Sequence, residues 1–523
     1  MAILLATLGM LQFGYQIAVL NVPQTQIELF FKITFQKRNL GKLSDATATT
    51  LFSIATSLML VGGILGALGT RWLGNTFGRK HGLVFIQLIS LTSAALGVLC
   101  DVCKSFEMLF ISRLLAGITS GLFTGLVPLY ISEIAPVHLR GAAGTVSNLA
   151  VTAGLLSAMV LGLESILGSE KMWPYLLFVP AVPAIVQLLF LPLMPESPRF
   201  LLITKRNFVE GKNALVRLRG TLNVYEEVHE ILQETRKDWG NRLYDSMKDS
   251  NNNIYEEDNL TVWQVVCSSK YRLSLFVCAC VQLSQQLTGI SALILYSTTF
   301  FQGAGIGCNM SNLASITIGV ILLVMTLVSV VLMEKLGRRT LHVYVGMTGM
   351  LICSLILNFA LVQEYANEKK NTTTIDCSLL NTPRHPKTND VSIYGKLVVI
   401  STLAFVVHFG LGPSSVPWLI SSEMFGQGPR AAAASFTIFC NWTSQLVVAL
   451  VFPQCQYYLG RYSFLPFLVV LTMLWAILLF YLPETKNQSA SQISLLFQLP
   501  NAWRKPIGFQ SPKLLGAIRT IIR

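Results

Sequence analysis

Long apolar runs recur along the whole chain, and they constrain its fold more than any other feature. A run of about 20 apolar residues can cross the hydrocarbon core of a bilayer as a helix. Such runs are numbered here as spans 1 to 12, and they occupy residues 2–22, 50–70, 82–102, 107–130, 142–163, 173–194, 271–302, 311–333, 341–362, 396–421, 431–454 and 463–482. Only 12% of the residues are charged, whereas a soluble domain carries about 25%. The sequence therefore predicts an all-α membrane protein with twelve transmembrane helices.

A polar stretch divides the spans into two groups of six. The predicted organisation is an N-terminal six-helix bundle over 1–194, linker helices over 195–270, a C-terminal six-helix bundle over 271–482 and a tail over 483–523. Lys and Arg are enriched in cytoplasmic loops, and they gather after spans 2 and 8 and in the tail. We therefore expect both termini, the linker and the tail to be cytoplasmic, although the basic loop after span 1 argues the other way. The net charge of +13 then requires no nucleic-acid partner.

Three charged motifs occur in the same order in both halves of the chain. Gly78-Arg79-Lys80 is matched by Gly337-Arg338-Arg339, and Pro195-Glu196 by Pro483-Glu484. A Glu followed seven residues later by an Arg completes each set, and the repeat indicates two pseudo-symmetric bundles. Arginine forks pair with carboxylates, so we expect these side chains to lock the two bundles together when the inner side is closed. The alternative is a purely topogenic role. The candidate gating residues are Arg79, Glu133, Arg140, Glu334, Arg338, Arg339, Glu423 and Arg430.

Span 7 carries three glutamines on one helix face, Gln282, Gln285 and Gln286. Amides inside a membrane span are costly unless they are paired. Three on one face therefore indicate a polar cavity, and the alternative is hydrogen bonding between helices.

Helix-breaking residues interrupt two spans. Gly289 follows the glutamines of span 7, and Gly412, Pro413 and Pro417 lie in span 10. Proline removes a helical hydrogen bond and glycine weakens a helix, and broken helices near the midplane form substrate sites in transporters. The alternative is a kinked packing helix. A separate ridge of small residues in span 4 predicts close helix packing and consists of Gly117, Gly121 and Gly125.

Several longer motifs occur together and in order. They are Leu11-Gln12-Phe13-Gly14-Tyr15, Pro195-Glu196-Ser197-Pro198-Arg199, Gln282-Leu283-Ser284-Gln285-Gln286-Leu287-Thr288-Gly289, Gly412-Pro413 with Pro417-Trp418, and Pro483-Glu484-Thr485-Lys486. With these motifs the chain resembles the facilitative hexose (glucose) transporter family, in the sugar porter branch of the major facilitator superfamily. The resemblance implies the major facilitator fold and passive transport of a hexose, glucose first, across the plasma membrane by alternating access.

The resemblance also implies a set of substrate-binding residues. A hexose needs amides, which both donate and accept hydrogen bonds, and aromatic rings to cover its apolar face. The positions that match the sugar-binding residues of the family, together with Gln282 on the same face of span 7, are Gln282, Gln285, Gln286, Asn148, Ser291, Trp418, Asn441, Trp442, Phe13 and Ile17. Gly289 and Tyr296 match an outer gate in span 7.

Departures from the family pattern keep other functions open. Asn148 and Ser291 replace a Gln and an Asn, and Leu322 and Gly410 stand where the family has polar side chains. Fructose or urate is therefore an alternative substrate. Proton-linked relatives have an Asp where this chain has Gln16, which favours passive uniport over proton-coupled symport. A non-transporting sugar sensor is a further alternative.

The sequence lacks the features of common enzymes. No phosphate-binding loop, zinc-binding HExxH motif or nucleophile elbow is present. The histidines are scattered, at His81, His138, His229, His342, His385 and His408. We therefore expect a carrier that needs no metal and no cofactor, with a small sugar and the lipid bilayer as partners and no nucleic acid. Asn371, in an Asn-Thr-Thr sequon, is the predicted glycosylation site.

Overall fold

The computed structural model describes residues 2–39, 41–136, 140–229, 231–232, 262–303, 306, 308–368, 392–425, 427–486, 488 and 493. Every regular element within these residues is helical. The chain separates into two units, Met1–Leu260 and Thr261–Arg523. Each unit is described by itself.

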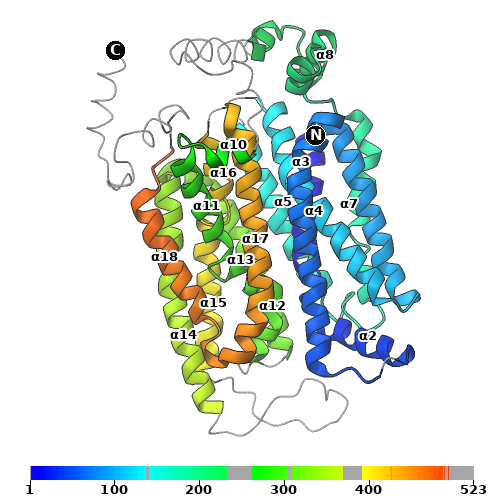
Figure 1. The fold of residues 1–523 in the computed structure, drawn as a ribbon, viewed down its shortest axis with the longest axis vertical. Helices are drawn as coiled ribbons and strands as arrows, with labels where there is room; N and C mark the ends of the chain where they lie inside the picture. Colours follow the sequence, from blue (N-terminus) through cyan, green and yellow to red (C-terminus); the bar gives the residue numbers. More distant parts are fainter. Residues whose placement is uncertain are drawn as a thin grey trace. The chain divides into compact units, whose positions relative to one another are not determined.

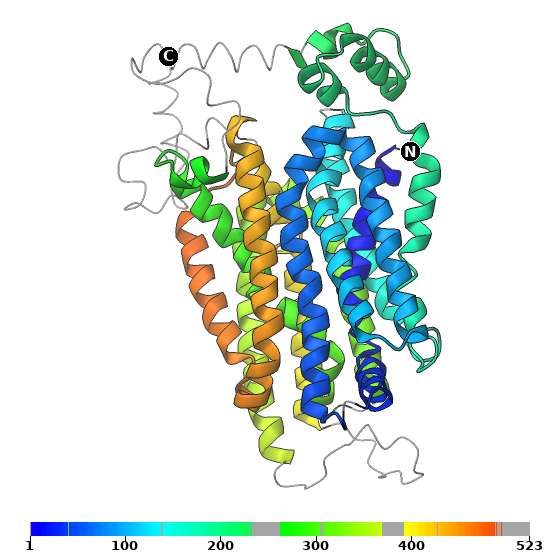
Figure 2. The same ribbon diagram turned by 45° about the vertical axis from the view of Figure 1, so that its right-hand side comes forward.

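The first unit holds the helices of spans 1 to 6 and a group of shorter helices (Figure 1). Its elements are α1 (Ala2–Ala18), α2 (Gln24–Lys37), α3 (Asp45–Val102), α4 (Phe106–Ile134), α5 (Arg140–Leu161), α6 (Trp173–Leu176), α7 (Ala181–Phe190), η2 (Leu191–Leu193), η3 (Phe200–Thr204) and α8 (Phe208–Arg219). Figures 1 and 2 both show α2 at one end of this unit and α8 at the other.

Helix α3 supplies two spans because it turns back on itself at Gly78. The φ of Gly78 is +83°, a conformation that residues with a Cβ avoid. Gly62 and Gly97 lie on either side of this turn, and they pack on neighbouring residues of α4, Leu114 and Ser112 respectively. The two arms of α3 are therefore spans 2 and 3, and both lie against α4.

Glycines bring α3 and α4 into backbone contact. A Cβ at Gly66 would collide with the carbonyl oxygen of Ile118, and one at Gly121 would collide with that of Gly63. Gly117 faces the carbonyl oxygen of Met59 in the same way. Close helix packing at the small-residue ridge of span 4 is thus confirmed.

The segment after span 1 is a helix and not the loop expected from its charges. Span 1 ends at Ala18, and α2 buries Phe30 and Phe31. The ring centroid of Phe30 lies 5.3 Å from that of Trp173. Just beyond α2, Arg38 donates to Glu107 at the start of α4 over 2.6 Å. The aromatic face of α2 therefore packs on Trp173, and Arg38 adds an ion pair with α4.

Short helices follow span 6. Asn207 caps α8 by accepting from the backbone N–H of Glu210 at 3.2 Å, and Gly220 ends it with a φ of +70°. A small apolar cluster stabilises this group and consists of Leu202, Leu215, Val224, Val228 and Ile231.

The second unit contains the remaining spans. Its elements are α10 (Val262–Cys267), α11 (Arg272–Gln286), α12 (Ile290–Gly303), α13 (Cys308–Leu336), η5 (Thr340–Met347), α14 (Thr348–Glu368), α15 (Ile393–Leu411), α16 (Val416–Glu423), α17 (Gln427–Leu459), η7 (Gly460–Tyr462) and α18 (Leu465–Tyr481). Span 7 is divided into α11 and α12, and span 10 into α15 and α16 (Figure 1).

The number of apolar crossings agrees with the prediction. Eight helical stretches in the described residues are long and apolar enough to cross a membrane, and three shorter apolar helices accompany them at Ala2–Ala18, Val146–Leu161 and Leu465–Tyr481. With α3 counted twice and the three shorter helices included, the described part of the chain holds twelve candidate crossings, six in each unit.

Two glycines of α3 provide a matched test of the helix contact. Gly66→Ala is expected to destabilise the protein by about 1–3 kcal/mol, because its methyl group meets the backbone of α4. Gly69→Ala is the control, since a Cβ there would lie 3.8 Å from Leu122. Thermal unfolding of the purified protein in detergent measures both variants. Equal melting temperatures would contradict the account of this interface.

Candidate functional site

The three glutamines of span 7 lie where this span is interrupted. Gln282 and Gln285 are buried in α11, with 0% and 5% of their surface exposed, and Gln286 is half-buried at the end of that helix. The chain then turns at Gly289, whose φ is +97°, before α12 begins. A Cβ at this glycine would lie 3.0 Å from the ring of Phe464. The break predicted at Gly289 is therefore confirmed.

Span 10 is interrupted as well, between α15 and α16. Gly412 follows α15, and its Cα has no room for a side chain because the carbonyl oxygen of Leu341 lies against it. Pro413 lies in the turn, and Pro417 is in the first turn of α16, where proline is tolerated. The carbonyl groups of Pro413 and Ser414 lie in this break.

Gln285 satisfies these carbonyl groups. Its Nε2 donates to the carbonyl oxygen of Pro413 at 3.0 Å and to that of Ser414 at 2.9 Å. Gln282 reaches α16 in a similar way, with its Nε2 3.2 Å from the hydroxyl oxygen of Ser421. The two interrupted spans are thus joined through glutamine side chains.

Asn441 of α17 connects the glutamines to one another. Its Nδ2 donates to Oε1 of Gln282 at 2.9 Å and to Oε1 of Gln285 at 2.6 Å. Its Oδ1 accepts from Nε2 of Gln286 at 3.2 Å, and Oε1 of Gln286 accepts from the hydroxyl of Ser291. These five residues are called the amide cluster below.

The amide cluster is neutral and offers both donors and acceptors. Within it, Gln282, Gln285 and Asn441 use their amide hydrogens in bonds between helices, which is the alternative reading of span 7. Gln286 is the half-buried member, whereas the other four are buried. An uncharged ligand that carries hydroxyl groups could therefore bind Gln286 first.

Aromatic side chains of the second unit surround this region to different degrees. Trp418 in α16 is half-buried, while Trp442, next to Asn441, is 1% exposed. Tyr296 lies at a kink in α12 and donates from its hydroxyl to the carbonyl oxygen of Ala449 over 3.0 Å. The hydroxyl of this candidate gate residue thus ties α12 to α17.

The first unit carries the remaining candidate binding residues. Phe13 is buried in α1, and Ile17 and Asn148 are half-buried in α1 and α5. Gly14 brings α1 against the backbone of α5, because a Cβ there would collide with the carbonyl oxygen of Val151. These positions are therefore set by a close contact between two helices of one unit.

A buried arginine of α4 binds Gln16 of α1. Arg113 in α4 donates from Nη1 to Oε1 of Gln16 at 2.6 Å and from Nη2 to its carbonyl oxygen at 2.9 Å. Arg113 is 1% exposed. Within the residues that the structure describes, it has no carboxylate partner.

A second amide network, in the first unit, was missed from the sequence. Gln12 donates to Gln87 at 3.2 Å, Gln87 donates to Gln187, and Gln187 donates to the carbonyl oxygen of Leu5 at 2.7 Å. Ser90 donates to Gln12 at 2.8 Å. The cost of an unpaired amide in a span indicates that each glutamine has a partner, but the partners come from three different helices.

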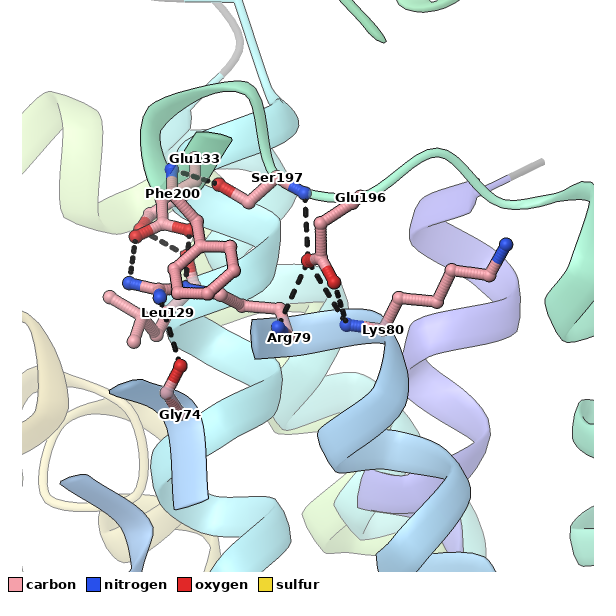
Figure 3. Close-up of polar contacts among 9 residues, drawn as sticks. Gly74, Arg79, Lys80, Leu129, Glu133, Glu196, Ser197 and Phe200 are labelled. Atoms are coloured by element: carbon pink, nitrogen blue, oxygen red, sulfur yellow. Dashed lines mark hydrogen bonds and ion pairs between the residues drawn. The ribbon is translucent and has the colours of Figure 1, made fainter. Parts of the chain in front are cut away.

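The charged motif of the first unit forms a compact network (Figure 3). Arg79 makes a bidentate pair with Glu133, with Nε and Nη2 each 2.8 Å from a carboxylate oxygen. Glu196 accepts from the backbone N–H groups of Arg79 at 2.9 Å and Lys80 at 3.1 Å. Phe200 lies over the guanidinium, with its ring centroid 4.9 Å from Cζ of Arg79.

The second unit repeats this arrangement at equivalent positions. Glu484 accepts from the backbone N–H groups of Arg338 at 2.8 Å and Arg339 at 3.1 Å. Nη2 of Arg338 lies 3.2 Å from Oε1 of Glu423. Gly337 has a φ of +90°, close to that of Gly78, and each glycine faces the repeated Glu.

In each motif, the ion pair that the structure describes joins two residues of the same unit. The contacts of each motif connect the turn between two spans to the end of a third span and to the segment after a fourth. A lock between the two bundles stays a prediction. The side chains of Arg140, Glu334 and Arg430 lie outside the described part of the structure, and so does Asn371.

Comparison with known proteins agrees with these features. The model of the "Sugar (and other) transporter" family matches residues 2–497. Facilitated glucose transporter member 3 of solute carrier family 2 from Ovis aries is 36% identical over 497 residues, covering 95% of this chain and 92% of that protein. The same member from Homo sapiens is 37% identical over the same length and coverage. Member 14 from Homo sapiens is 36% identical and is covered to 87%.

Solved structures with the same fold come from a bacterial transporter. The partially occluded inward-open form of the xylose transporter XylE from E. coli has a TM-score of 0.71 and 22% sequence identity, covering 93% of this chain and 98% of that one. The structure of the proton:xylose symporter XylE with 6-bromo-6-deoxy-D-glucose also has a TM-score of 0.71, with 21% identity.

Two interrupted spans joined by a neutral amide cluster, within twelve apolar crossings and a repeated charged motif, define a multi-pass membrane carrier of the major facilitator fold. The chain belongs to the sugar transporter family. It is therefore a carrier and not an enzyme.

The two ion pairs differ in burial and geometry, which provides a test. Glu133→Gln leaves Arg79 buried without its carboxylate, so we expect destabilisation by about 3–5 kcal/mol. Glu423→Gln is expected to cost less, because the pair with Arg338 is more exposed and rests on one contact of 3.2 Å. Thermal unfolding in detergent compares them. A larger loss for Glu423→Gln would show that the first pair is not the stronger anchor.

Proposed function

We propose that this chain carries hexoses, foremost glucose, by facilitated diffusion across the plasma membrane. The observation that carries the proposal is the amide cluster at the two interrupted spans of a sugar transporter family member. Its neutral groups match the hydroxyls of a sugar, which both donate and accept. Glucose is favoured because relatives at 36–37% identity are named facilitated glucose transporters.

Gln286 is the proposed first contact for the sugar. It is half-buried, and its Oε1 accepts from Ser291, a hydroxyl that a sugar hydroxyl can replace. Gln282, Gln285 and Asn441 hold the shape of the site through their bonds between helices. Trp418, Trp442, Phe13, Ile17 and Asn148 complete the proposed set of lining residues.

Passive uniport follows from the pairing of Arg113. A proton-driven carrier needs a titratable group on its pathway, and XylE, which shares the fold, is a proton:xylose symporter. In this chain Arg113 binds the neutral side chain of Gln16. The fold is shared with XylE, but this pair supports transport that runs only down the sugar gradient.

The gates and the orientation are also proposals. Tyr296 and the break at Gly289 would let α12 close the outer side, and the two charged motifs would close the inner side. The bundles 1–194 and 271–482 would move against each other around the sugar. The linker 195–270, the tail 483–523 and both termini would then be cytoplasmic.

Fructose is the second candidate substrate, because two polar family positions are apolar contacts here. Leu322 is buried in α13, and Gly410 packs on Met325, where a Cβ would lie 2.6 Å from that side chain. A sugar hydroxyl directed there loses a partner, at a cost of about 1–3 kcal/mol. The lost binding energy would differ between hexoses, because their hydroxyl groups point in different directions.

Uptake of labelled glucose, fructose and urate in cells that express the chain tests the proposal. We expect saturable hexose uptake with glucose as the preferred substrate. Uptake of urate without hexose would overturn the substrate assignment, and surface expression without any uptake would favour a sensor.

Changing Gln286 to Leu is expected to raise KM for glucose about tenfold, because a buried sugar hydroxyl loses its partner. Gln36→Leu is the matched control, since it removes the same side chain at an exposed position of α2. Initial rates of uptake, normalised to surface expression, measure both. An unchanged KM in Gln286→Leu would show that this residue does not bind the sugar.

Gln16→Asp is expected to make uptake depend on pH, because it places a titratable carboxylate against Arg113. Gln16→Asn is the control that keeps an amide, and its uptake should stay independent of pH, as in the unmodified protein. Uptake rates of both variants, measured over a series of external pH values, test this expectation. If the unmodified protein itself requires an inward proton gradient, uniport is wrong.

A further inference from the structure

One histidine of span 9 is fully buried beside the interrupted spans. His342 is 0% exposed and lies in η5, a π-helical segment that precedes α14. Segments of this kind are rare and occur frequently at functional sites, because they leave some carbonyl groups free for other partners. His342 belongs to neither the amide cluster nor the charged motifs.

Carbonyl groups of η5 accept from side chains outside its own backbone ladder. Nδ1 of His408 in α15 lies 3.1 Å from the carbonyl oxygen of Val345, and the hydroxyl of Thr348 donates to Val343 over 3.0 Å. The segment is therefore fastened to span 10 by a side chain of that span.

The same segment packs directly on the break in span 10. A Cβ at Gly412 would lie 3.1 Å from Cα of His342, and one at Gly346 would lie 2.5 Å from Cδ of Pro413. Neither glycine leaves room for a side chain. The turn that exposes the carbonyls of Pro413 and Ser414 to Gln285 thus rests on η5.

His342 extends this contact to span 7. Its Nε2 lies 3.1 Å from the hydroxyl oxygen of Ser284, the neighbour of Gln285 in α11. The hydroxyl of Ser284 donates to the carbonyl oxygen of Val281 at 2.7 Å, so its hydrogen is already used. Nε2 of His342 is therefore assigned as the donor to the Ser284 hydroxyl.

The surroundings of Nδ1 favour the neutral imidazole. Nδ1 has no hydrogen-bond partner among the described residues. A proton there would be a buried donor without an acceptor, which is costly. His342 is thus assigned as the neutral tautomer that donates from Nε2 to Ser284.

We infer that His342 is a positioning residue for sugar binding. It fixes the rotation of α11 about its axis through Ser284, while η5 supports the break in span 10, so that Gln285 meets the carbonyls of Pro413 and Ser414 and Gln286 is presented to the sugar. This inference rests on the proposed function, since it assigns His342 a part in sugar affinity. A movement of span 10 would reach span 7 through this residue.

Kinetics of His342 variants test the inference. His342→Leu removes the donor, so KM for glucose is expected to rise about tenfold with a smaller change in the maximal rate. His342→Gln retains an N–H donor and should recover most of the affinity for glucose. If the Leu variant does not fold, the KM of His342→Gln tests the inference in its place. Ser284→Ala should raise KM in the same direction. Ser315→Ala is the matched control, because the hydroxyl of this buried serine donates to the carbonyl oxygen of Ser311 in its own helix, α13.

The double variant His342→Leu/Ser284→Ala separates positioning from general stability. We expect its KM to be no higher than that of the worse single variant, because both changes break one contact. Additive effects on KM, or a lower melting temperature with an unchanged KM, would overturn the inference. If the unmodified protein transports no sugar, the proposed function fails, while the same cycle in melting temperature still decides whether His342 holds span 7: additive losses would overturn it.

Discussion

Inside a bilayer, every backbone polar group must find its partner within the protein, and the described residues of the second unit depend on this constraint. Two spans are interrupted there, and the break in span 10 places backbone carbonyl groups in a turn. Gln285 satisfies those of Pro413 and Ser414, and Asn441 then holds Gln285 and Gln282. The groups that bind these carbonyls and hold the two interrupted spans together are therefore neutral amides.

In the repeated charged motif, side chains at the ends of the spans also bind backbone groups. In both units a glycine with positive φ lets the chain turn, and the Glu that follows the sixth span of that unit accepts from the N–H groups beyond that glycine. An Arg from the same turn then reaches a second carboxylate. Because Glu196 and Glu484 bind backbone groups, they reinforce the turn itself. These contacts thus stabilise each unit by itself.

Local features were predictable from the sequence, and partners between helices were not. The breaks at Gly289 and Gly412-Pro413 could be predicted because positive φ and the missing N–H of proline are properties of single residues. The helix α2 was missed, because its charges hid the apolar face that meets Trp173. The links from Gln12 to Gln87 and from His342 to Ser284 depend on the rotation of whole helices, which one sequence does not reveal. A gating role for the charged motifs stays a prediction, because the described partners of Arg79 and Arg338 lie within their own units.

Passive transport of an uncharged sugar is the central claim, and uptake by proteoliposomes that contain the purified chain tests it most directly. Labelled glucose should enter until its internal concentration equals the external one, and an imposed proton gradient should change neither the rate nor the end point. Accumulation above the external concentration under that gradient, or entry no faster than into empty liposomes, would contradict the account.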